Sequence, residues 1–150
     1  MRRSILALLT GIALCGNTHA ADDSLYRAFG EKAGLSTLMT DFVARLKADP
    51  RIGGFFKGVN AKHLATQLTD QLCAVSGGPC TYEGEPMGKS HKDLGIARAD
   101  FNALVEVLQD TMGARGIAFG DQNRMLALLA PMHREIVTRS PGPSAGPWSR

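Results

Sequence analysis

Apolar side chains recur at helical spacing in four stretches of the chain. The first begins at Leu35 and places apolar residues at i, i+3, i+4, i+7, i+8 and i+11, one face of an amphipathic helix. The other three carry Leu64, Leu68, Leu72 and Val75; Phe101, Leu104, Val105, Leu108 and Met112; and Met125, Leu126, Leu129, Met132 and Ile136. A shorter helix over residues 24–29 precedes them. With no β-type alternation of any length, the pattern predicts an all-α fold with four principal helices.

Residues near the helix ends indicate where the helices begin and stop. Asp49 precedes a proline, and a residue in that position is disfavoured in the helical region, so the first long helix should end there. Asn60 is expected to cap the second, and Asp121 the last. Pro131 lies inside the last apolar pattern and should bend that helix about one turn earlier.

Residues 77–96 read GGPCTYEGEPMGKSHKDLGI. Their apolar residues recur neither at the helical period of about 3.6 nor at the strand period of about 2. They are predicted to form a loop with room for one short helical turn. A long loop between good helices is unusual in a compact domain and is often functional. His91 is its only imidazole. A lone loop histidine is most often a surface residue, so these residues alone leave both a structural and a binding role open.

The first twenty residues have the pattern of an export signal. Arg2 and Arg3 form a basic start, residues 5–15 an apolar run, and residues 18–20 a small-residue cleavage site. The apolar run is too short to span a bilayer as a helix. We therefore expect a cleaved signal peptide over residues 1–20 and a soluble, exported product in the periplasm.

Removal of the signal leaves one domain, residues 21–139, followed by a Pro/Gly/Ser-rich tail, residues 140–150, that is expected to be disordered. The formal net charge falls from +3 to +1 because Arg2 and Arg3 leave with the signal. No stripe of Lys and Arg remains, which argues against nucleic acid as a partner. The chain also has no predicted membrane span.

Two cysteines remain in the exported chain, Cys73 and Cys80. In an oxidising compartment a disulfide between them is favoured over two reduced, buried thiols. Such a bond closes a short loop and contributes about 2–3 kcal/mol on a chain-entropy estimate. The spacing matches neither CxxC nor a usual zinc pattern.

Several segments, in this order, resemble the group I truncated haemoglobins, the short two-over-two helical globins. They are SLYRAFG, DFVARLKADPRIGGFF, the GGP at residues 77–79, YEGEPM, SHKDLGI and LLAPMHREIV. The resemblance runs from residue 24 to about residue 137. It implies a two-over-two helical sandwich as the fold and haem as the cofactor. No CxxCH motif is present, so haem b held without a covalent bond is expected.

The resemblance identifies His91 with the proximal histidine, the only protein ligand to the haem iron. Neutral imidazole is a good iron donor, and a single axial ligand leaves the opposite face open for a diatomic gas. The second ring nitrogen of His91 is expected to be oriented by a backbone carbonyl in the same loop.

The resemblance also assigns nine residues to the lining of the haem pocket. They are Val43, Phe56, Leu64 and Leu68 on the distal side and at the ring; Met87, Ile96 and Phe101 on the proximal side; and Gln67 and Tyr82 near the propionates. By sequence pattern alone, the apolar members of this set are ordinary core residues.

The distal positions depart from the family pattern. Val43 stands where a tyrosine usually follows Asp-Phe, and Leu68 stands where glutamine is frequent. A hydrogen bond to bound dioxygen is worth roughly 1–3 kcal/mol, so its loss predicts weak retention of oxygen. Gln71, one turn beyond Leu68, is an alternative donor, but its spacing from the leucine stripe favours a side chain that faces solvent.

Three functions are compatible with the sequence. The leading one is a non-catalytic haem protein that reversibly binds oxygen, nitric oxide or carbon monoxide and is served by an electron donor. The second is a haem enzyme, a nitric-oxide dioxygenase or a peroxidase; a peroxidase needs a distal base, and the predicted distal stripe has none. The third is a helical interaction module or thiol-redox protein based on Cys73 and Cys80, without haem.

Overall fold

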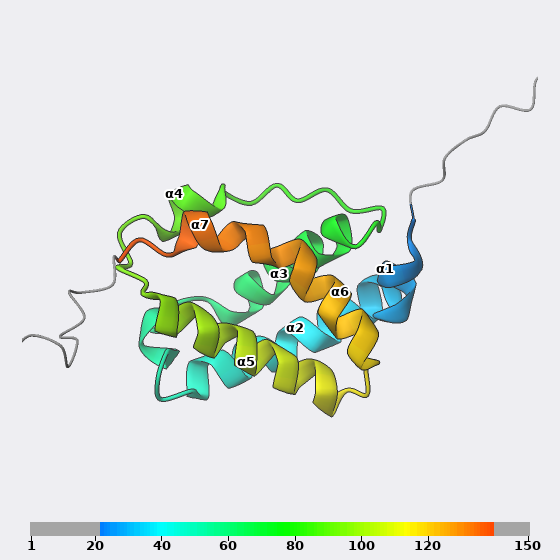
Figure 1. Ribbon diagram of the computed structural model, residues 1–150, viewed down its shortest axis with the longest axis horizontal. Helices are drawn as coiled ribbons and strands as arrows, with labels where there is room; N and C mark the ends of the chain where they lie inside the picture. Colours follow the sequence, from blue (N-terminus) through cyan, green and yellow to red (C-terminus); the bar gives the residue numbers. More distant parts are fainter. Residues whose placement is uncertain (1–21, 140–150) are drawn as a thin grey trace, which may run out of the picture.

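The structure, a computed structural model, describes residues 22–139, and these residues form helices and loops without a strand (Figure 1). The predicted signal peptide and the predicted disordered tail lie outside the described residues. No described helix has both the length and the apolar character that crossing a membrane requires.

Four long helices account for most of the described chain, as the apolar pattern predicts. The elements in order are α1 (Ser24–Ala28), α2 (Glu31–Ala48), the 3-10 turn η1 (Gly53–Phe56), α3 (Ala61–Val75), α4 (Met87–His91), α5 (Arg98–Ala114), α6 (Phe119–Leu129), the 3-10 turn η2 (Ala130–Met132) and α7 (His133–Ile136).

The long helices pack in two pairs, α2 against α3 and α5 against α6, and α2 also contacts α5 (Figure 1). The largest fully buried side chains come from α2, α5 and α6 and from the corner after α2: Leu35, Leu38, Met39, Leu46, Ile52, Met112 and Met125. The core therefore lies between the pairs, and the loop that follows α3 runs along its outside.

The apolar stripe of α2 is buried as predicted, with every residue from Leu35 to Leu46 in the pattern no more than 3% exposed. At the start of α2, a Cβ on Gly34 would lie 2.1 Å from the Phe29 carbonyl oxygen, so only glycine fits this close approach. The helix ends at Ala48, directly before Asp49, which confirms the predicted stop.

Of the two predicted caps, one is present. The Asn60 side-chain oxygen accepts a hydrogen bond from the His63 backbone N–H at 3.0 Å, which caps α3. The prediction for Asp121 is wrong, because α6 begins at Phe119 with Ala118 at the cap position. Asp121 instead lies in the first turn, where its negative charge interacts favourably with the positive end of the helix dipole.

Pro131 interrupts the last helix at its own position rather than one turn earlier. The α-helix stops at Leu129, and a 3-10 turn follows over Ala130–Met132 before α7 resumes. Pro131 lies in the first residues of this turn, where its missing N–H is not needed. After the interruption, Met132 contacts Gln71 of α3, His133 packs against Phe101 of α5, and α7 packs against α4.

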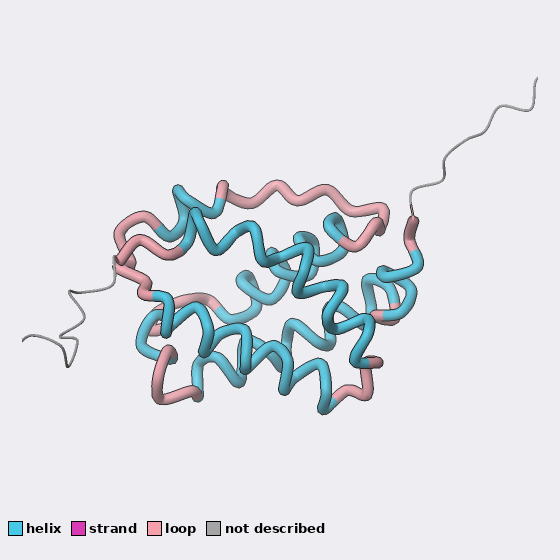
Figure 2. Tube along the Cα trace, in the orientation of Figure 1, coloured by secondary structure: helices cyan, strands magenta, loops and turns pink. Residues whose placement is uncertain are grey.

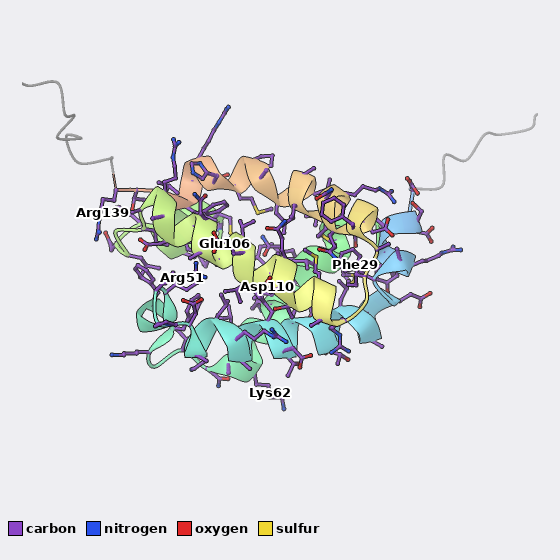
Figure 3. The ribbon with its side chains drawn as sticks, turned by 60° about the horizontal axis from the view of Figure 1, so that its bottom comes forward. Phe29, Arg51, Lys62, Glu106, Asp110 and Arg139 are labelled. Carbon is purple, nitrogen blue, oxygen red and sulfur yellow. A yellow bond between two sulfur atoms is a disulfide. The ribbon has the colours of Figure 1, made fainter. Side chains whose placement is uncertain are left out.

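Ion pairs of Arg51 connect the corner between α2 and α3 to α5. Arg51 pairs with Asp49 at 2.9 Å and with Glu106 of α5 at 2.5 Å, and Figure 3 shows Arg51 and Glu106 side by side. Because the Arg51 and Glu106 side chains are both exposed, the pair between them contributes little stability. The following residues, Phe55 and Phe56, are half-buried and pack against the core, as expected for aromatics in this turn.

Candidate functional site

The segment around His91 is a loop that holds one short helical turn, as predicted. After α3 the chain runs in an extended loop across the molecule and then forms the five-residue α4, with His91 as its last residue (Figure 2). No residue of α4 is fully buried. The turn therefore presents His91 without inserting it into the core.

Backbone and side-chain contacts fix the His91 ring. Its Nδ1 lies 2.8 Å from the Met87 carbonyl oxygen and 2.9 Å from Ser90 Oγ. A carbonyl oxygen can only accept, which assigns the proton to Nδ1 and leaves the lone pair on Nε2. A backbone acceptor within the same loop, as expected, is thus present. An imidazole held in this tautomer is suited to donate Nε2 to a metal ion.

Helix α3 carries two rows of inward residues with different burial. Ala65, Thr69 and Leu72 are fully buried against the core, whereas Leu64 and Leu68 are only half-buried. Further large apolar side chains pack on the core in the same half-buried way: Phe55, Phe56, Leu104, Leu126 and Leu129. Large apolar groups that the core covers only in part fit a flat apolar cofactor such as haem.

The remaining apolar residues of the predicted site differ in burial. Val43 is 1% exposed and belongs to the main core cluster, and Ile96 is 8% exposed in the loop after α4. Phe101, at the start of α5, is half-buried and packs edge-on against the His133 ring, with centroids 4.9 Å apart and an interplanar angle of 88°. Met87 is half-buried in the same helical turn as His91.

The two polar residues of the predicted site are half-buried, Gln67 on α3 and Tyr82 in the loop. The Tyr82 hydroxyl donates to the Glu85 carbonyl oxygen at 3.4 Å. Burial, and to a lesser extent the Glu85 charge, raises the pKa of Tyr82, so its hydroxyl stays protonated at neutral pH. A Cβ on Gly84 would lie 2.2 Å from this hydroxyl oxygen, so Tyr82 folds back onto its own loop.

Gln71 contradicts the expectation that it faces solvent. Its side chain is buried, with 6% exposure, and its amide nitrogen lies 3.3 Å from Met132 Sδ and 3.8 Å from Met87 Sδ. Gln71 follows Leu68 by three residues and precedes Val75 by four, which places all three on one helix face. The prediction from its spacing to the leucine stripe, that Gln71 faces solvent, is therefore wrong, and the same spacing also permits a buried position beside Leu68 and Val75.

Two surface hollows are formed without His91. One, of about 390 Å³, is lined by residues between Lys47 and Lys57, and the other, of about 550 Å³, by residues around Tyr26 and Pro79. Neither has His91 in its wall. We assign the candidate site from the fixed imidazole and the partly covered apolar side chains.

The fold is that of a two-over-two globin. Residues 24–138 match the family of bacterial-like globins, and the chain belongs to that family. It is 31% identical over 119 residues to the group 1 truncated haemoglobin of Mycolicibacterium paratuberculosis, an alignment that covers 79% of this chain and 88% of the relative.

Solved structures show the same architecture. Truncated haemoglobin from Tetrahymena pyriformis, in its Fe(III) form, superposes with a TM-score of 0.72 at 26% identity, covering 75% of this chain and 97% of that one. The 2/2 haemoglobin of a Synechococcus species, in the cyanomet state with covalently attached haem, gives a TM-score of 0.72 at 21% identity, covering 77% and 98%. The predicted truncated-globin fold is confirmed.

Proposed function

We propose that the protein is a haem protein that reversibly binds a diatomic gas, with His91 as the axial protein ligand. Membership of the truncated haemoglobins supports haem-based gas binding in general. The observation that carries the assignment to His91 is its hydrogen bond to the Met87 carbonyl oxygen, which leaves Nε2 free as a donor. Haem, when bound, supplies an iron with an axial position for the gas.

The surroundings of His91 favour a macrocycle over an ion held by side chains alone. Among residues 22–139, no group of three or more His, Cys, Asp or Glu side chains converges on one point. One imidazole is too little to retain an iron ion, so the remaining donors have to come from the cofactor. The half-buried apolar side chains of α3, such as Leu64 and Leu68, would cover the ring and exclude water.

We further propose that the cofactor is haem b, held without a covalent bond. The chain has no CxxCH motif. Acidified organic solvent should therefore extract all of the haem from the purified protein. Haem that stays with the polypeptide would show a covalent link and overturn this part of the proposal.

The distal positions favour a gas that needs no hydrogen bond. Val43 and Leu68 carry no polar atom where relatives often place a donor, and Thr69 on the same helix is already bonded to the Ala65 carbonyl oxygen at 2.7 Å. Dioxygen gains more than carbon monoxide from a donor. We expect fast oxygen release and a strong preference for carbon monoxide.

Export to the periplasm is part of the same proposal and rests on the pattern of residues 1–20. The N-terminus of protein recovered from the native host tests it. Sequencing should begin at Ala21. A chain that retains Arg2 and Arg3 would exclude cleavage at this site.

The decisive experiment compares two histidine variants by absorption spectroscopy in the ferric, ferrous and carbon monoxide forms. His91→Gly should lose the wild-type ferrous spectrum and regain it when free imidazole is added. His63→Gly is the matched control, because His63 is an exposed histidine on α3. A His91→Gly protein with an unchanged ferrous spectrum would rule out His91 as the ligand, and a wild type without a Soret band would rule out the haem function.

A further inference from the structure

The chain reaches the His91 turn through a segment with few attachments. Among the described residues, the backbone groups of residues 79–85 make no backbone hydrogen bond. The polar contacts of the segment are local: Tyr82 donates to the Glu85 carbonyl oxygen, and Glu85 pairs with Lys89 at 2.6 Å. Figure 2 shows this stretch as an extended loop between α3 and α4. Its position is therefore set mainly by what holds its two ends.

A disulfide holds the first end. Cys73 lies in the last turn of α3 with 0% exposure and is bonded to Cys80, with the two Cα atoms 5.7 Å apart. The predicted disulfide is thus present. The turn between the cysteines is closely packed, because a Cβ on Gly78 would lie 2.7 Å from Cys73 Sγ and 2.6 Å from the Tyr26 ring. Cys80 is consequently fixed to the core, seven residues before Met87.

The last helix holds the other end. The Ile96 carbonyl oxygen accepts hydrogen bonds from the backbone N–H groups of Thr138 at 3.1 Å and Arg139 at 3.0 Å. Helix α4 itself packs against α7. Figure 3 shows Arg139 at the end of the molecule where α5 begins. His91 therefore lies between two anchors, one covalent and one made by the residues after α7.

We propose that the Cys73–Cys80 disulfide is a positioning element for His91, and that its reduction changes the contact between His91 and the haem iron. This inference rests on the proposed function. In the reduced chain the nearest anchor before α4 is the hydrogen bond from the Gly78 N–H to the Cys73 carbonyl oxygen, at 2.8 Å. The free segment gains two residues, which allow about 7 Å of slack.

Greater freedom of the segment is expected to move the imidazole as well, because the ring is hydrogen-bonded to the backbone of its own turn. The hydrogen bond from Nδ1 to the Met87 carbonyl oxygen makes the ring move with the backbone of α4. Contacts of α4 with α7 oppose that movement but form no covalent link. The reduced protein should therefore populate more positions of the His91 ring than the oxidised protein.

The bond is open to reduction from one side. Cys73 is fully buried, whereas Cys80 is half-buried. A thiolate of a dithiol reductant attacks the Cys80 sulfur, the sulfur–sulfur bond breaks, and Cys73 leaves as a thiolate that takes up a proton. The second thiol of the reductant then loses its proton and displaces Cys80. Two electrons pass to the protein, which gains two thiols, while the dithiol becomes a cyclic disulfide.

Hydrogen exchange on haem-free protein tests the restraint without the cofactor. The hydrogen-bonded amides of α4, those of Lys89 and Ser90, should exchange severalfold faster after dithiothreitol treatment than in the oxidised chain. The variant Cys73→Ser/Cys80→Ser should reproduce the reduced wild type and show no further change with dithiothreitol. Equal exchange in all of these samples would overturn the inference.

Two measurements on the haem-loaded protein test the effect on His91. Reduction should increase the rate of haem transfer to excess apomyoglobin severalfold, and should shift or broaden the ferrous iron–histidine stretching band in resonance Raman spectra. Asn60→Ala is the matched control, because it weakens the cap of α3 at the end far from Cys73. That variant should leave the stretching band unchanged, which separates positioning from a general loss of stability.

The outcomes distinguish this inference from the proposed function. The inference alone would be overturned if the wild type binds haem through His91 but its stretching band and its haem transfer rate do not change when the disulfide is reduced. A wild type that binds no haem would overturn both.

Discussion

Helix α3 and the His91 turn both contribute to the candidate site, but they are held in place in different ways. Helix α3 has fifteen residues, a side-chain cap from Asn60 and a face buried in the core. Helix α4 has five residues and no fully buried side chain, and it depends on a disulfide before it and on Ile96 after it. The apolar wall thus comes from a helix whose place the core determines. The iron-binding imidazole that we propose comes from a segment restrained at its ends.

This difference separates stability from cofactor binding. A change in α3 is expected to act first on the folded state as a whole, because its buried row is part of the core. A change in the His91 segment is expected to act first on the cofactor, because the segment buries little surface. The following predictions test this separation, from the largest expected effect to the smallest.

The largest effect is expected from Leu72→Ala on α3. Leu72 is 2% exposed, and removal of a buried leucine side chain costs about 2–5 kcal/mol of unfolding free energy. Chemical denaturation of the haem-free protein measures it. Leu94→Ala is the control in the His91 segment: Leu94 is 44% exposed, and its loss should change the unfolding free energy by about 0.5 kcal/mol or less. Equal losses would contradict the proposed separation.

The apolar core face of α3 could be predicted from sequence, whereas the His91 side could be predicted only in part, as a loop with one short helical turn and a disulfide. Regular spacing placed Leu72 and the α2 stripe in the core, because burial follows from periodicity in a long helix. His91 lies in a segment without a period, and only the resemblance to the truncated haemoglobins singled it out. Its orientation depends on Met87 and on anchors distant in the sequence, and no local pattern encodes these contacts.

Polar residues caused the local errors. Asp121 matched the residue type of a cap, but the helix begins two residues earlier, and the charge acts in the first turn instead. The spacing of Gln71 from the leucine stripe predicted a solvent-facing side chain, yet it is buried, and its amide nitrogen lies near the thioether sulfurs of Met87 and Met132. Met87 belongs to α4 and Met132 to η2, so the partners of Gln71 could not be predicted from the pattern of α3.

Val43→Tyr tests whether the apolar character of the predicted distal positions, Val43 on α2 and Leu68 on α3, controls the gas. If the new hydroxyl reaches the ligand, oxygen release should slow about tenfold, since a hydrogen bond of about 1.4 kcal/mol corresponds to a factor of ten. Stopped-flow oxygen dissociation measures it. Carbon monoxide dissociation should change much less.

Val43 is also a core residue with 1% exposure, so the same variant has a structural cost. Overpacking at such a position typically costs about 1–3 kcal/mol. Val43→Phe is the matched control, because it adds the ring without the hydroxyl. If Val43→Tyr and Val43→Phe release oxygen at equal rates, the position does not face the ligand.

Asn60→Ala should lower the unfolding free energy by about 1 kcal/mol, through loss of the bond from the His63 N–H. The thermal midpoint of the haem-free protein measures this effect. Asn60→Asp should retain most of the stability, because a carboxylate also caps a helix. Haem affinity changed by more than the stability change accounts for would show that α3 and the cofactor are coupled, against the proposed separation.

The smallest effect is expected at Gln71, which joins the two regions because its amide on α3 contacts Met87 beside His91. Thioether sulfur is a weak acceptor, so the buried amide gains little from its partners, and Gln71→Leu should alter the unfolding free energy by less than about 1 kcal/mol.

The variant Gln71→Glu tests the burial of the same position through its pH dependence. Burial disfavours the ionised carboxyl and raises its pKa above the ordinary value of about 4.3. Relative to wild type, this variant should be little destabilised below that pH and should lose stability as the pH rises, because only its unfolded state ionises freely. If the difference in unfolding free energy between Gln71→Glu and wild type stays constant with pH, the side chain at position 71 reaches water. Helix α3 and the His91 turn would then not exclude water from their contact.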